Sequence, residues 1–109
     1  MLPTPACPAF TVPQLASFLA WCAGDTWHGL LPVVRCDCEL FEEVIELHRE
    51  GGDPLCPCWF IYRALDGTIY VLRNASGARQ TPAASPEEAQ ALIEMAEATE
   101  HRATAKRPA

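Results

Sequence analysis

The strongest constraint on the fold is a pair of β-prone runs separated by Asp66-Gly67. The runs 59–65 and 68–73 are rich in aromatic and β-branched residues, which favour strands. Asp-Gly between two such runs is typical of a two-residue type I′ turn, because both central residues need positive φ. We therefore predict a tight β-hairpin in which Leu65 pairs with Thr68. Both faces of this hairpin are apolar, so we expect helices to cover one face and partly shield the other.

Helices are predicted near both ends of the chain. Thr11 is an N-cap residue for a helix over about 13–23, which Gly24 ends. This helix is apolar on nearly every side, so it is either deeply buried or covered by a partner. Ser85-Pro86-Glu87-Glu88 begins a second helix, which runs to about residue 100. Its inner stripe consists of Ala89, Leu92, Ile93 and Ala96.

The segment 39–50 is predicted to be a third, acidic helix. Its apolar stripe contains Leu40, Phe41, Val44, Ile45, Leu47 and His48, at spacings of three and four residues. The preceding run 30–35 has strand character, and Pro32 suggests an edge strand or a bulge. These assignments leave 74–84 as a loop.

The predicted elements make one small α+β domain spanning residues 1–109. Their order is α-β-α-β-β-α, with two or three largely antiparallel strands and a hairpin packed against helices. One domain is expected because 109 residues suffice for a single hydrophobic core. We expect about 1–10 and 102–109 to be frayed or irregular.

The charge of the chain disfavours several functions. The formal net charge is −6, whereas direct nucleic-acid binding needs a basic surface. No apolar run reaches transmembrane length, and the N-terminal residues resemble no secretory signal. We therefore expect a cytoplasmic protein, in the host cytoplasm if a phage encodes it, that contacts neither nucleic acid nor membrane.

Two closely spaced cysteine pairs raise the question of a metal site. Cys36 and Cys38 form one pair, and Cys56 and Cys58 form the other. Four thiolates can hold zinc, but paired ligands usually have two or more residues between them. A helix over 39–50 would also place the pairs at its opposite ends. We predict no metal and no cofactor; if a metal is bound, these four cysteines are the candidate ligands.

Catalysis is not predicted for this chain. Cys38, with His28 or His48 as its base, is the one candidate nucleophile set. No catalytic signature or phosphate-binding loop is present. We therefore predict a non-enzymatic protein with no catalytic residues. The alternative is a cysteine-centred domain, either metal-binding or thiol-reactive, with a regulatory or enzymatic role, that uses both cysteine pairs.

Protein binding is the function that the sequence favours. Glu39, Glu42, Glu43 and Glu46 would share one face of the acidic helix, and Trp21 and Trp27 lie in a nearly uncharged segment suited to an interface core. We expect a small inhibitor module that occludes a basic surface of another protein. Anti-CRISPR-like inhibitors from phages or mobile elements are a model for this action. The apolar first helix could also pair two copies of the chain.

Overall fold

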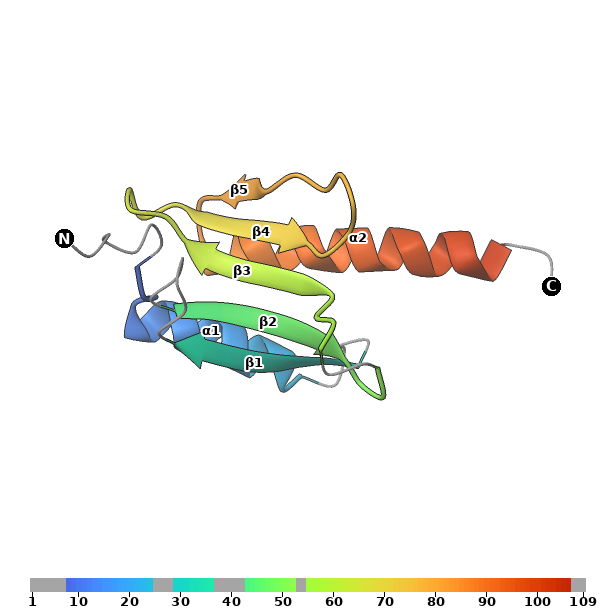
Figure 1. Cartoon of the computed structure of the whole chain (residues 1–109), viewed down its shortest axis with the longest axis horizontal. Coiled ribbons are helices and arrows are strands. Elements are labelled where there is room, and N and C mark those ends of the chain that lie inside the picture. The colour runs from blue at the N-terminus through green and yellow to red at the C-terminus, as the bar shows by residue number, and fades with distance from the viewer. Residues whose placement is uncertain (1–7, 25–28, 37–42, 53–54, 107–109) are drawn as a thin grey trace.

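The computed structural model describes residues 8–24, 29–36, 43–52 and 55–106, with side chains described as far as residue 100. A first helix precedes five strands, and a long helix follows them (Figure 1). The elements are α1 (Val12–Cys22), β1 (Leu30–Cys36), β2 (Glu43–Arg49), β3 (Trp59–Arg63), β4 (Ile69–Arg73), β5 (Thr81–Ala83) and α2 (Pro86–Lys106). The strands form one antiparallel sheet in the order β1-β2-β3-β4-β5.

The predicted α-β-α-β-β-α order and the two- or three-stranded sheet are wrong. Residues 43–49 form strand β2 and not part of an acidic helix. β2 pairs with β1 on one side and with β3 on the other, and four of its seven residues are buried. A strand buried on both faces lacks a polar–apolar alternation, so its apolar run resembles a helical stripe.

A short fifth strand was also missed by the sequence analysis. β5 lies within the segment that we expected to be a loop, and it pairs with β4 at the edge of the sheet. It has three residues and contains Pro82, which cannot donate to a strand ladder. Neither its length nor its composition produces a strand signal.

The predicted hairpin is confirmed, but its register differs by one residue. Arg63 pairs with Ile69, whereas a two-residue turn would pair it with Tyr70. Backbone hydrogen bonds from Ala64 N to Thr68 O (2.8 Å) and from Gly67 N to Ala64 O (2.9 Å) close a loop of three residues. Such a loop ends in a glycine bulge, and Gly67 has a φ of +91°.

The helix starts agree with the sequence signals. Thr11 Oγ1 accepts a hydrogen bond from Gln14 N, while Gln14 Oε1 accepts one from Thr11 N. This reciprocal capping box satisfies two amides that the helix leaves unpaired. At α2, Ser85 Oγ accepts a hydrogen bond from Glu88 N (3.1 Å). That helix continues to Lys106, beyond the predicted end near residue 100.

Pro32 lies in an edge strand, as predicted, and its position there costs no ladder hydrogen bond. Glu50 N donates to Gly29 O (2.6 Å), so these two residues form a hydrogen-bonded pair in the β1–β2 register. In an antiparallel ladder, hydrogen-bonded pairs alternate with pairs that are not hydrogen-bonded. Since Gly29 is in a hydrogen-bonded pair, the even-numbered residues of β1 point their backbone N–H and C=O groups toward the free edge. A proline at such a position also hinders pairing with another strand.

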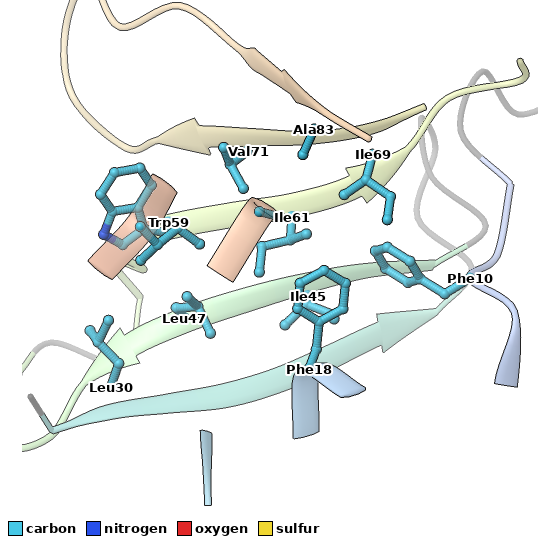
Figure 2. Close-up of a cluster of buried hydrophobic side chains, with 12 residues drawn as sticks. Phe10, Phe18, Leu30, Ile45, Leu47, Trp59, Ile61, Ile69, Val71 and Ala83 are labelled. Carbon is cyan, nitrogen blue, oxygen red and sulfur yellow. The ribbon is translucent and has the colours of Figure 1, made fainter. Parts of the chain in front are cut away.

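Both helices pack on one face of the sheet, which we call the inner face. Figure 2 shows the strand side chains Leu30, Ile45, Leu47, Trp59, Ile61, Ile69 and Val71 gathered there with Phe18 from α1. Phe10, which precedes α1, Ala83 from β5, and Ala89 and Ile93 from α2 complete this cluster. All four residues predicted for the inner stripe of the last helix are confirmed there, since Leu92 and Ala96 also pack against the core.

Candidate interaction surface

The opposite face of the sheet, which we call the outer face, is covered by neither helix (Figure 1). Successive residues of a strand point to opposite faces, so the pairing registers assign its side chains. They are Leu31, Val33 and Arg35 of β1, Val44, Glu46 and His48 of β2, Phe60 and Tyr62 of β3, Tyr70 and Leu72 of β4, and Pro82 of β5. Most of these side chains are apolar or aromatic.

The centre of the outer face is an aromatic cluster. The rings of Tyr62 and Tyr70 are stacked, with centroids 5.7 Å apart and an interplanar angle of 25°. The Tyr62 hydroxyl donates a hydrogen bond to Gln80 Oε1. Val44 and Tyr62 are buried, while Phe60, Tyr70 and Leu72 are partly exposed around them. The cluster therefore has a packed base and an accessible upper layer.

Strand β1 extends the apolar character to the edge of the sheet. Leu31 is 50% exposed and Val33 is 38% exposed. We name the apolar outer-face residues of β1 to β4 the outer patch; they are Leu31, Val33, Val44, Phe60, Tyr62, Tyr70 and Leu72. Exposed apolar groups gathered over several strands are typical of interaction sites.

A polar cluster of Arg35 on β1 and Glu46 and His48 on β2 lies within the outer face. Glu46 Oε1 accepts a hydrogen bond from Arg35 Nε (2.7 Å) and lies 3.0 Å from His48 Nε2. Burial raises the pKa of Glu46, but hydrogen bonds and charge from Arg35 and His48 outweigh it and hold this pKa below its usual range. His48 is buried, and its Nδ1 has no hydrogen-bond partner within the described parts of the chain.

The structure does not support one acidic face that contains Glu43 and Glu46. Three residues apart in a strand, they point to opposite faces of the sheet. Glu43 Oε1 accepts a hydrogen bond from Phe10 N (3.0 Å), and Glu46 belongs to the polar cluster. The other two predicted members, Glu39 and Glu42, lie outside the described residues.

The structure describes only one of the two predicted tryptophan anchors. Trp21 packs partly buried against the core, 6.4 Å from the Phe18 ring in an edge-to-face arrangement. Its Nε1 donates a hydrogen bond to Glu94 Oε1 of α2 (3.1 Å), so it links the two helices. Trp27 lies outside the described residues.

Cys36 does not lie beside Cys58 in the described structure, and Cys38 lies outside the described residues. Cys36 pairs with Glu43 at one end of β2, while Cys58 precedes Trp59, which pairs with Leu47. Four strand residues separate these positions by about 13 Å. The predicted helix over 39–50 was wrong, and strand β2 lies between Cys36 and Cys58. Within the described residues, no three His, Cys, Asp or Glu side chains are arranged to hold a metal ion.

Of the candidate catalytic residues, the structure describes only His48. His48 lies on the outer face beside Glu46, and Cys38 and His28 lie outside the described residues. The sequence indicates that both faces of the hairpin are apolar, but it does not predict the outer patch. The patch exists because neither helix covers this face of the sheet. Neither that arrangement nor the size of the sheet was predicted.

Among the described helices, none combines the length and apolar character needed to cross a membrane.

Comparisons with other proteins do not extend these observations. The chain matches no protein-family model, no curated protein and no solved structure.

Proposed function

We propose that this chain is a small, non-enzymatic protein-binding module that docks through the outer patch. One observation carries this proposal: both helices cover the inner face, while the outer face presents aromatic and aliphatic side chains. An antiparallel sheet with one face in water normally alternates apolar residues inward and polar residues outward. The outward-facing residues of β3 and β4 are apolar and so depart from that rule. Packing of the inner-face core does not explain why these residues are apolar.

The chemistry of the patch favours a protein as the ligand. The patch extends over four strands of a sheet, whereas small ligands are usually held in concave pockets. Aromatic residues are enriched in the buried centres of protein interfaces. Leu31 is half exposed, so covering it would contribute on the order of 1 kcal/mol, about half of the value for a fully exposed leucine. We therefore propose a partner that presents an apolar surface segment to Phe60, Tyr70 and Leu72.

The polar cluster supplies orientation within this apolar contact. Arg35, whose side chain is half exposed, offers a charged contact at the rim. The net charge of −6 also favours encounter with a basic partner. This is the remaining support for the basic partner that we expected from the sequence.

Binding through the outer patch would act by occlusion. The partner surface covered by this domain would be unavailable to other ligands, which is how a small inhibitor without catalytic residues works. An inhibitor from a phage or mobile element fits this mode of action. The partner itself is best identified by affinity capture with the whole chain, followed by binding measurements on the purified pair.

Charge substitutions on the two sides of the molecule test this proposal. Leu72→Lys and Val33→Lys place a cation in the outer patch, and each should weaken partner binding at least about tenfold, equivalent to 1.4 kcal/mol. Leu65→Lys at the hairpin tip and Met95→Lys on α2 are matched controls, since Leu65 and Met95 are exposed apolar residues away from the patch. The controls should bind as the wild type does. Wild-type affinity in both patch variants, with unchanged melting temperatures, would refute the proposed docking face.

A further inference from the structure

A second candidate site lies at the N-terminal end of β3, where the sheet meets α2. It is a pocket of about 330 Å³ whose lining includes Arg49, Cys56, Cys58, Trp59, Arg73 and Glu97. This volume is in the range of small-molecule sites. Two cysteines that line one pocket are not explained by the proposed docking function, and this pocket is independent of the outer patch.

The backbone around the two thiols is anchored to the neighbouring strands. Cys58 N donates to Leu47 O (2.6 Å), and Cys58 O accepts from Asn74 N (2.9 Å). Asn74 Nδ2 also donates to Pro57 O (2.7 Å). The Cys-Pro-Cys segment is therefore held at the end of the sheet, next to the pocket that both cysteines line.

The two thiols differ in access and are separated by one residue, Pro57. Both are free, with Cys56 exposed and Cys58 partly buried. Residues two apart have Cα atoms at most about 7 Å from each other, which is at the upper limit for a disulfide. The Cys-Pro-Cys segment must therefore shorten for the two sulfurs to bond. Cys56 is thus suited to react first with a molecule in solution, and Cys58 to react second.

The charges around the pocket are paired with one another. Its lining contains two guanidinium groups and one carboxylate, and Arg73 of this lining forms an ion pair with Glu100 of α2. Arg49 Nη2 donates to Glu97 Oε1 (3.0 Å), and Arg49 lines the pocket together with Cys58. Burial lowers the pKa of Arg49, but Glu97 and, to a smaller extent, Cys58 outweigh that effect and raise it. Arg49 therefore stays cationic beside the thiols.

We propose that Cys56 and Cys58 form a reversible dithiol site that reacts with low-molecular-weight disulfides. Cys56 sulfur attacks one sulfur of the small disulfide, whose S–S bond breaks, and one small thiol leaves with its proton. Cys58 sulfur then attacks the Cys56 sulfur, forming the Cys56–Cys58 bond and releasing the second small thiol. The protein loses two electrons and two protons, and the small disulfide gains both.

This disulfide would be easily reversed. It closes a very short ring that contains Pro57, whose φ is fixed. Strained and exposed disulfides are more readily reduced than structural ones. The site would therefore follow the ratio of small disulfide to small thiol around it, and would not staple the fold permanently.

Glutathione redox mixtures test this inference on the whole chain. After incubation in excess glutathione disulfide, alkylation and peptide mass mapping should show a Cys56–Cys58 bond, which excess reduced glutathione removes. Cys58→Ser should instead retain one glutathione on Cys56, and Cys56→Ser should slow reaction at Cys58 at least about tenfold because it is less exposed. Cys36→Ser, a change at an exposed cysteine on β1, should leave the bond unaffected. Melting temperatures of all variants show that the fold is retained. Two unchanged thiols, or only stable glutathione adducts in the wild type, would overturn the proposal.

Discussion

The two faces of one sheet carry similar residues but differ in what covers them. On the inner face, Ile45 and Ile61 are fully buried beneath Phe18 of α1 and Ile93 of α2. On the outer face, neighbouring strand positions carry Phe60, Tyr70 and Leu72, which stay partly exposed. Hydrophobicity at a strand position therefore does not reveal which face forms the core. In this chain the inner face stabilises the fold, and we propose that the outer face serves a partner.

The largest predicted difference between the faces is in stability. Ile61→Ala should lower the free energy of unfolding by about 2–5 kcal/mol, because it leaves a cavity in the closed core. Leu72→Ala removes a side chain of the same size from the partly exposed face, and should cost at most about 1 kcal/mol. Urea unfolding of both variants measures this difference. Equal losses would show that the outer face is as tightly packed as the inner one.

Two tryptophan–glutamate contacts sharpen the comparison between buried and exposed parts of the molecule. Glu97 is buried and accepts hydrogen bonds from Trp59 Nε1 (3.2 Å) and Arg49 Nη2. Glu97→Ala should cost about 1–3 kcal/mol, because the indole N–H is left buried without an acceptor. Glu94 is exposed and accepts a hydrogen bond from Trp21, so Glu94→Ala should cost less. Thermal unfolding compares the two, and a larger loss for Glu94→Ala would contradict this assignment.

The hairpin loop controls which side chains reach each face, since a shift of one residue in a strand register reverses them. Gly67 holds the positive φ that ends this loop. Gly67→Val should destabilise the domain by about 1–3 kcal/mol, since a β-branched residue is strained there. Gly67→Asn is the control and should lose less, because asparagine tolerates positive φ. Equal melting temperatures for valine and glycine would contradict the observed loop.

The smallest predicted effect concerns pH and the polar cluster of the outer face. The pKa of Glu46 is lower in the fold than the usual value of about 4.3 for an unfolded chain. Its contribution to stability is therefore present above that value and is lost as the pH falls through the folded pKa. Because Arg35 is half exposed, we expect less than about 1 kcal/mol. Glu46→Gln should flatten the decrease in melting temperature below pH 4.3, and an unchanged pH profile would contradict this role.

Local signals in the sequence predicted elements correctly where neighbouring residues determine the structure. Thr11, Ser85 and the Asp66-Gly67 step marked two helix starts and a hairpin, because caps and tight turns depend on a few adjacent residues. Strand β2 was mistaken for a helix because pairing with β1 and β3, which are distant in sequence, decides its conformation. The hairpin register depended on one extra loop residue, Leu65.

The candidate interaction surface was less accessible to sequence reasoning than the fold. Phe60 and Tyr70 were recognised as strand residues, but their exposure depends on both helices lying on the opposite face. The acidic residues were grouped by helical spacing, which does not apply to Glu43 and Glu46 in a strand. A surface composed of four paired strands can be identified only once their order and registers are known.

Site-specific photo-crosslinking tests the outer face most directly. A photoreactive phenylalanine analogue at Tyr70 would report contacts of the outer patch, and the same residue at Leu65 or Met95 would report other exposed surfaces. We predict that the bound partner is crosslinked strongly from position 70 and weakly or not at all from positions 65 and 95. Crosslinking of the partner from position 95 but not from position 70 would contradict the proposal that the uncovered sheet face is the docking surface.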